Sequence, residues 1–372
     1  MRASRFRDLD LNVLIPVLLL SLLSLKLIYE LYGLQRAFLQ AVWFGLSAAV
    51  LLVVLSVDYR SLTRISVFLY PLLLLALGAV LFTSPINGAR SWFRFGRISI
   101  QPSEFAKPAM ILVLAAWLPF RDSFKRFTGL LPPLLFTLVP FGLVILQPDL
   151  GTAALYVPLF LVVVLTAGAR LRHILFLFLI AIALSPVFYA NLADHQKRRI
   201  QAFLNPERFS TSTSLHLERA KIALGAGGFT GFTPEGEDAA PHMSFLTYAG
   251  SDYAFAVVGE MFGLVGTAGV LLLLLWLFYG LYALFLRIRD PVGRLIIAGA
   301  FAVLASQAFL HIGGNLHLVP FTGVPLPFLS YGGSSLMSSM ICIGLALNVG
   351  LRRRLTFGDE GAPPDSSGTA GD

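Results

Sequence analysis

The feature that most constrains this chain is a series of apolar runs, each about 20 residues long or longer. Ten runs follow one another, at residues 11–32, 36–56, 65–84, 103–119, 130–147, 150–169, 172–191, 251–286, 294–318 and 330–351. A helix of this length and character crosses the roughly 30 Å hydrocarbon core of a bilayer. Only 13% of the 372 residues are charged, whereas soluble domains carry about 25%. The sequence therefore predicts an all-α polytopic membrane protein with ten transmembrane helices.

The short loops between the runs differ in charge on the two sides of the predicted membrane. The side that carries both termini holds sixteen basic residues, namely Arg2, Arg5, Arg7, Arg60, Arg64, Arg121, Lys125, Arg126, Arg170, Arg172, Arg287, Arg289, Arg294, Arg352, Arg353 and Arg354. The other side holds four, namely Arg36, Arg90, Arg94 and Arg97. Because cytoplasmic loops are enriched in Lys and Arg, we expect both termini in the cytoplasm. The net charge of +8 then reflects topology and does not indicate a nucleic-acid partner.

One long segment, residues 192–250, separates the seventh run from the eighth and becomes an extracellular loop in this topology. We expect residues 1–351 to form a single transmembrane domain, whose first span is retained and not cleaved as a signal peptide. Residues 352–372 form a cytoplasmic tail that we expect to be disordered. The single cysteine, Cys342, allows neither a disulfide within the chain nor a cysteine metal site.

The segment from Thr247 to Gly263 ends the long loop and carries two acids, Asp252 and Glu260. On a helix their carboxylates would share roughly one face, about 12 Å apart. Acids at a membrane need a compensating environment or a function. Two interpretations of Asp252 remain open: it caps the following helix, or it is a functional carboxylate at the outer surface.

The eighth run is too long for one plain membrane crossing. As a continuous helix, residues 251–286 would extend about 54 Å, so the helix must tilt, overhang or break. Gly263, Gly266 and Gly269 are the expected points of kinking or close packing.

Residues 87–108 place arginines next to aromatic residues on the outer side. Trp92 and its aromatic neighbours fit an interfacial belt. Alternatively, Arg90, Arg94 and Arg97 bind an anion, because guanidinium groups match phosphate oxygens.

Two polar motifs near helix starts have structural explanations. Glu104 and Lys107 stand three residues apart at the start of the fourth run, behind Ser103 as a candidate cap. We expect them to form an ion pair, since neither charge is stable alone in lipid. Asp149 is expected to cap the sixth run.

The long loop contains three recognisable pieces. Residues 195–206 (HQKRRIQAFLNP) are basic and partly amphipathic, and they place Arg198 and Arg199 at the outer surface. Residues 215–224 predict a short helix. The glycine-rich run that follows lacks the Lys-Ser/Thr ending of a phosphate-binding loop, so it is a weak signal for phosphate.

Residues 315–335 (NLHLVPFTGVPLPFLSYGGSS) are too rich in proline and glycine for an ordinary transmembrane helix. Irregular backbone at membrane depth must be buried in protein or line a wet cavity. This segment resembles the signature of the SEDS family (shape, elongation, division and sporulation), to which RodA and FtsW belong. The region around Trp92 and residues 101–107, 147–152, 195–206 and 251–260 follow in the family's order, so the resemblance spans roughly residues 10–350.

The resemblance implies a peptidoglycan glycosyltransferase of the bacterial cytoplasmic membrane that polymerises lipid II at the outer face. It also implies a class B penicillin-binding protein as the crosslinking partner, and other proteins of the cell-wall elongation complex. The family's essential aspartate corresponds to Asp252, its loop tryptophan to Trp92, and its Glu–Lys pair to Glu104 and Lys107. The chain departs from the family pattern before Asp252, where residues 246–252 read LTYAGSD. The short tail favours a role in elongation and cell shape, as for RodA, over division, as for FtsW.

These residue types suit that chemistry. A sugar hydroxyl attacks the donor anomeric carbon, undecaprenyl diphosphate leaves, and a single inversion needs only one base. We assign Asp252 as the base and Arg97 and Arg199 as ligands of the diphosphate. Trp92 is assigned as a further substrate contact. A divalent cation, Mg²⁺ or Mn²⁺, is the alternative means of stabilising the departing diphosphate. Because these groups all fall at outer ends of spans, we predict one shared cavity that opens to the outer leaflet.

Two alternatives belong to other functional classes. A lipid II flippase needs a polar path through the membrane, for which the sequence offers only Lys26, Glu260 and Asn315. A scaffold that merely activates its partner would leave Asp252 dispensable. The gathering of polar residues at the outer face favours the enzyme.

Overall fold

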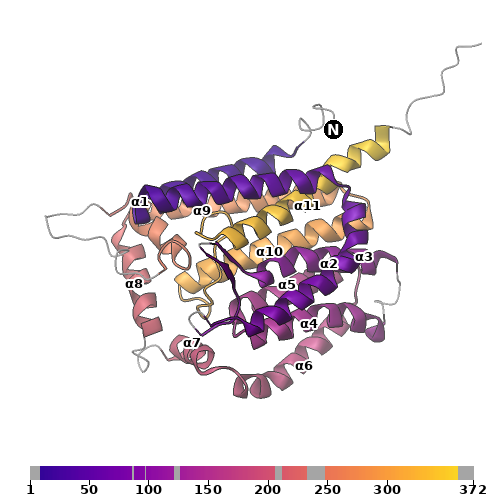
Figure 1. Ribbon diagram of the computed structural model, residues 1–372, viewed down its shortest axis with the longest axis horizontal. Helices are drawn as coiled ribbons and strands as arrows, with labels where there is room; N and C mark the ends of the chain where they lie inside the picture. Colours follow the sequence, from indigo (N-terminus) through magenta and orange to yellow (C-terminus); the bar gives the residue numbers. More distant parts are fainter. Residues whose placement is uncertain are drawn as a thin grey trace, which may run out of the picture.

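The computed structural model describes residues 9–85, 88–96, 98–120, 126–205, 212–232 and 248–358. Within these ranges the chain forms eleven α-helices and one small hairpin (Figure 1), namely α1 (Leu11–Ser56), α2 (Tyr59–Ala79), β1 (Phe93–Phe95), β2 (Ile98–Ile100), α3 (Pro102–Trp117), α4 (Leu131–Leu146), α5 (Leu150–Thr166), α6 (Leu171–Ala190), α7 (Asp194–Leu204), α8 (Ser212–Ala226), α9 (Ala254–Arg287), α10 (Pro291–Asn315) and α11 (Gly333–Gly358). All ten predicted runs lie on helices, and α1 contains the first two. The predicted helical fold is confirmed.

Of the described helices, seven are long and apolar enough to cross a membrane: α1, α2, α4, α6, α9, α10 and α11. Helices α3 and α5 are shorter, with 16 and 17 residues. The outward faces are strongly apolar, because Phe68 on α2 is 78% exposed and Leu272 on α9 is 65% exposed. So much exposed apolar surface is stable only against lipid or another protein.

Two long helices are broken at a glycine, and the break in α9 was predicted from the length of the eighth run. Gly263 breaks the helical geometry of α9 with φ 61° and ψ −155°. Gly33 does the same in α1 with φ 77°, which separates the first two predicted spans. Glycine has no Cβ and therefore adopts positive φ at little cost.

Helices α10 and α11 form the centre of the bundle. Helix α10 packs against α3, α5, α9 and α11, while α1 lies along α9 and α11 on one side (Figure 1). Helix α6 lies at the opposite edge of the view in Figure 1, and only 6% of its most apolar window is buried. The chain between α10 and α11, residues 316–332, is therefore anchored at both ends in the core.

Those residues, which we call the Pro-rich loop, form turns, bends and irregular backbone, as their composition predicted. The hairpin of β1 and β2 pairs Phe93 with Ile100 and leads directly into α3. Pro102 is the first residue of α3 and Gln101 is its N-cap. The prediction that Ser103 caps this helix is therefore wrong, because proline already fills the first helical position.

The long loop contributes α7, which covers residues 195–204 of the predicted amphipathic segment, and α8, which includes the predicted short helix. The glycines after α8 lie directly on α9: a Cβ on Gly227 would come within 1.8 Å of the Gly259 carbonyl oxygen. The Leu264 N–H also donates to the Gly228 carbonyl at 2.9 Å. Close backbone packing therefore explains the glycine-rich run without phosphate binding.

This packing makes a specific prediction about two neighbouring glycines. Gly227→Ala should lower the free energy of unfolding of the purified protein by about 1–3 kcal/mol, because overpacking displaces α8 from α9. Gly225→Ala is the matched control, since nothing lies within 4 Å of its Cβ position. That variant should be neutral or gain about 0.5–1 kcal/mol from its place in α8. Equal melting curves for the two variants would contradict the packing account.

Candidate active site

Asp252 lies in a tight turn immediately before α9. The turn is closed by the Asp252 N–H, which donates to the Tyr248 carbonyl at 3.0 Å. Helix α9 begins at Ala254, and Tyr253 occupies its N-cap position. The capping interpretation of Asp252 is therefore wrong, and the carboxylate is available for another role.

Three successive carbonyl groups of this turn, those of residues 250–252, are each bound by the region around the Pro-rich loop. The first accepts from the Tyr331 N–H at 2.7 Å, the second from Ser330 Oγ at 2.6 Å, and the third from Asn315 Nδ2 at 3.1 Å. A turn without regular secondary structure needs such partners when it is buried. The Asp252 backbone is thus held by residues about 60–80 positions away in the chain.

The Asp252 carboxylate lies against Gly323 of the Pro-rich loop. A Cβ on Gly323 would be 3.3 Å from Asp252 Oδ2. The carbonyl of the preceding residue, Thr322, accepts a hydrogen bond from Arg199 Nη1 on α7 at 3.3 Å. The structure therefore brings a carboxylate and a guanidinium, predicted separately from the sequence, to one pair of loop residues, Thr322 and Gly323.

The electrostatic environment of Asp252 suits proton transfer near neutral pH. Desolvation by burial raises the pKa of the Asp252 carboxyl to about 6. A hydrogen bond from Ser251 and the positive charge of Arg199 oppose this rise. A general base is most effective when its pKa lies near the working pH, so Asp252 combines a suitable position with a suitable pKa.

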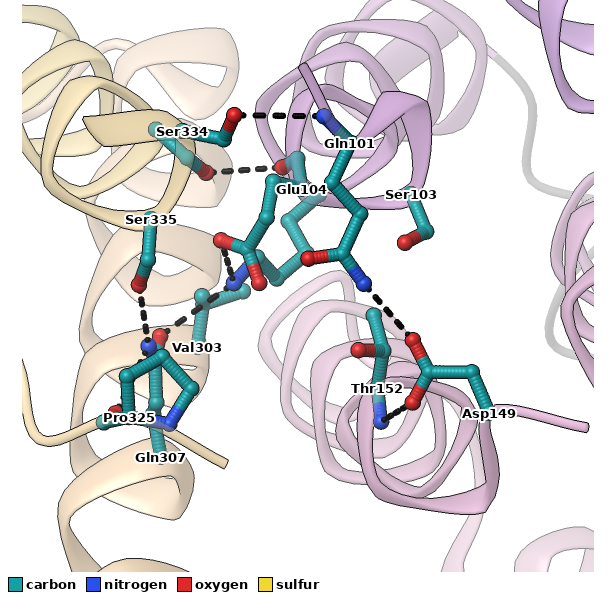
Figure 2. Close-up of polar contacts among 12 residues, drawn as sticks. Gln101, Ser103, Glu104, Asp149, Thr152, Val303, Gln307, Pro325, Ser334 and Ser335 are labelled. Atoms are coloured by element: carbon teal, nitrogen blue, oxygen red, sulfur yellow. Dashed lines mark hydrogen bonds and ion pairs between the residues drawn. The ribbon is translucent and has the colours of Figure 1, made fainter. Parts of the chain in front are cut away.

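A buried polar network of α3, α10 and α11 side chains contacts the Pro-rich loop at Pro325 (Figure 2). Lys107 Nζ lies 2.6 Å from Glu104 Oε2, which confirms the predicted ion pair, and the two side chains are 0% and 2% exposed. The same ammonium donates to Gln307 Oε1 at 3.3 Å. Gln307 Nε2 in turn donates to the Pro325 carbonyl at 3.0 Å and to Ser335 Oγ at 3.1 Å. The ion pair therefore joins α3, α10, α11 and the loop.

The start of α5 also packs against the Pro-rich loop, at Thr322. Asp149 caps this helix as predicted, since its Oδ1 accepts from the Thr152 N–H at 3.1 Å. Its Oδ2 accepts from Gln101 Nε2 at 2.8 Å (Figure 2). A Cβ on Gly151 would be only 2.6 Å from the Thr322 carbonyl oxygen, so α5 leaves the loop little room to shift.

The other predicted site residues are less closely connected to Asp252. Trp92 is half-buried beside the hairpin, and Ser334 Oγ on α11 donates to the Ser99 carbonyl of β2 at 3.4 Å. Arg90 donates to the Leu81 carbonyl at 3.2 Å. Arg97 lies outside the described residues. The roles assigned to Trp92 and Arg97, and the shared cavity, stay predictions.

The metal prediction also stays open. Among the residues that the structure describes, no group of three or more His, Cys, Asp or Glu side chains is arranged to hold a metal ion.

The site residues predicted from the sequence do not include a polar stripe on α10. Gln307, His311 and Asn315 recur every fourth residue, so they share one face of the helix, and all three side chains are buried. Each contacts the Pro-rich loop or the Asp252 turn. Their regular spacing inside an apolar run was the signal that identifies them.

A bundle of lipid-facing helices with a partly buried carboxylate beside a guanidinium is typical of a membrane protein with a polar functional site. Residues 3–355 match the family described as "Cell cycle protein", the family of FtsW, RodA and SpoVE. The chain belongs to this family, which is the SEDS family that its motifs resemble, and it is a multi-pass membrane protein.

Named relatives cover nearly the whole chain. A probable peptidoglycan glycosyltransferase FtsW of Geobacter metallireducens is 33% identical over 87% of this chain and 86% of the relative. The peptidoglycan glycosyltransferase RodA of Treponema pallidum is 29% identical over 95% of this chain and 100% of the relative. A chain in the solved structure of a peptidoglycan synthase complex, which coordinates polymerization and crosslinking, superposes with a TM-score of 0.79 at 30% identity, over 93% of this chain and 98% of that one.

The buried network makes a prediction about single and double variants. Lys107→Met should destabilise the protein by about 3–5 kcal/mol, because it leaves the Glu104 carboxylate buried without its cation. The double variant Glu104→Gln, Lys107→Met should lose less stability than the single variant, since it leaves no buried charge without a partner. Thermal unfolding in detergent measures both. A single variant as stable as the wild type would show that the ion pair does not support the fold.

Proposed function

We infer that this chain is a peptidoglycan glycosyltransferase and propose that its reaction takes place at Thr322 and Gly323 of the Pro-rich loop. This location is supported by one observation: the Asp252 carboxylate lies against Gly323, and Arg199 donates a hydrogen bond to the Thr322 carbonyl. The membership of the chain in the FtsW, RodA and SpoVE family carries the reaction class.

In the proposed reaction, lipid II units are joined at the outer face of the cytoplasmic membrane. The acceptor sugar hydroxyl attacks the anomeric carbon of the donor, and Asp252 Oδ2 takes the proton from that hydroxyl. A carboxylate with a pKa of about 6 is largely ionised at neutral pH and accepts this proton readily. Because the attack inverts the anomeric centre once, the reaction needs no covalent enzyme intermediate.

The bond from the anomeric carbon to the diphosphate oxygen breaks as the new glycosidic bond forms, and undecaprenyl diphosphate leaves. Arg199 is placed to bind the departing diphosphate, since guanidinium donors pair with phosphate oxygens as their charge grows. Arg97 and Trp92 remain proposed substrate contacts. Mg²⁺ or Mn²⁺ would accompany the diphosphate, and omission of these ions from the reaction tests that requirement.

We propose a class B penicillin-binding protein as the crosslinking partner, on the basis of the similar chain in a peptidoglycan synthase complex. The relatives bear the names of both elongation and division proteins. We propose the elongation role, with both termini in the cytoplasm. Depletion in the native cell should then give round cells, whereas filaments would indicate the division role.

Polymerisation and flipping are separated by an assay in detergent. Purified protein with lipid II should make glycan strands there, although detergent offers no second leaflet to which lipid II is moved. A flippase would make no polymer in this assay. A scaffold would make none either, even when a catalytically inactive partner protein is added.

The first functional prediction concerns Asp252. Asp252→Asn should lower the polymerisation rate by roughly 100- to 10,000-fold, because an amide cannot accept the proton. The wild-type rate should fall as the pH drops through about 6, since protonation of the carboxyl removes the base. Rates from pH 5 to 8, with protein folding checked by its melting curve, measure both effects. An Asn variant near the wild-type rate would contradict the assignment.

A second prediction compares two adjacent arginines of α7. Arg199→Gln should slow polymerisation by roughly 100-fold, as loss of one group that stabilises a developing anion does. The acid limb of the pH profile should also move to higher pH, because Arg199 lowers the pKa of Asp252. Arg198→Gln is the control, since Arg198 is exposed, and it should stay near the wild-type rate. Equal profiles for the two variants would rule out the proposed role of Arg199.

A further inference from the structure

His311 on α10 lies between the Asp252 turn and the Pro-rich loop and contacts both. Its Nδ1 is 2.8 Å from the Val324 carbonyl oxygen. Its Nε2 accepts the Phe255 N–H at 3.4 Å. The side chain is 2% exposed, so these protein groups define its surroundings.

The two contacts determine the form of the imidazole ring. The Val324 carbonyl only accepts hydrogen bonds, so Nδ1 must carry a proton. The Phe255 N–H only donates, so Nε2 must be unprotonated. His311 is therefore a neutral imidazole with the proton on Nδ1.

Both groups that His311 binds need a partner. Phe255 is in the first turn of α9, where the N–H groups have no acceptor inside the helix. Val324 belongs to irregular backbone in the bundle core, where a carbonyl without a donor is costly. One side chain with a donor and an acceptor satisfies both, whereas an aliphatic side chain satisfies neither.

We propose that His311 is a positioning residue, which sets the separation between the Asp252 carboxylate and the loop residues Thr322 and Gly323. Phe255 follows Asp252 by three residues and Val324 directly follows Gly323. A ring bonded to both therefore links the two sides of the reaction centre through a single rigid group. Asn315, one turn further along α10, fixes only the Asp252 side, through the Asp252 carbonyl.

This inference rests on the proposed glycosyltransferase reaction. Misplacement of a catalytic group by about 1 Å costs up to roughly 100-fold in rate. Loss of the histidine should therefore lower kcat and leave the KM for lipid II nearly unchanged, because the His311 side chain binds the backbone of Phe255 and Val324 and not the substrate.

The test compares four full-length proteins in the detergent polymerisation assay: the wild type, His311→Leu, His311→Gln and Leu304→Ala. His311→Leu should lower kcat roughly 10- to 100-fold with KM within a factor of about two. His311→Gln should recover most of the rate, because its amide also offers both a donor group and an acceptor group. Leu304→Ala creates a cavity in the same helix at a fully buried position, and it should lower the melting temperature with kcat per folded molecule unchanged.

A wild-type kcat in His311→Leu would overturn the proposal. So would equal losses in the Leu and Gln variants that follow their melting temperatures, because that pattern indicates stability alone. Histidine nitrogen NMR of the wild type adds a test that needs no variant to fold: a protonated Nε2 on His311 would also overturn it. A wild type that makes no polymer would instead contradict the proposed function, so the wild-type rate distinguishes failure of the proposed function from failure of this inference.

Discussion

The buried contact between Glu104 and Lys107 is the interaction on which the rest of the site depends. Two charges with almost no exposure are stable in a bundle core only as a pair with further hydrogen bonds. The further bond goes to Gln307, which holds the Pro325 carbonyl and Ser335. A pair on one turn of α3 thereby determines where the backbone between α10 and α11 lies.

The Pro-rich loop in turn organises the groups to which the proposed reaction assigns a chemical role. It has no helix of its own, so its polar backbone groups are bound by Gln307 and His311 of α10 and by Arg199 of α7. Its last residues bind the carbonyls of the Asp252 turn. The same packing that fixes the turn withdraws the Asp252 carboxylate from water, and this desolvation raises its pKa to about 6. The stability of the fold and the proposed catalysis therefore depend on the same packing.

Features that depend on neighbours in sequence could be predicted from the residues. The helical runs follow from hydrophobicity, the break at Gly263 from the length of the eighth run, and the ion pair of Glu104 with Lys107 from their spacing of three residues. Contacts between distant segments could not be predicted in this way. The hydrogen bond from the Tyr331 N–H to the Gly250 carbonyl joins residues that only the packing of helices brings together. The N-cap of α9 is Tyr253 and not Asp252, which the local sequence also did not indicate.

The central claim is that the diphosphate of the donor lies beside Thr322 and Gly323, between Asp252 and Arg199. The most direct measurement is photo-crosslinking with a lipid II analogue that carries its reactive group next to the diphosphate, followed by mass spectrometry of the labelled peptides. The account predicts label in α7 and in residues 316–332, with competition by unmodified lipid II. Label confined to the opposite ends of the helices, near Tyr59 and Asp290, would contradict it.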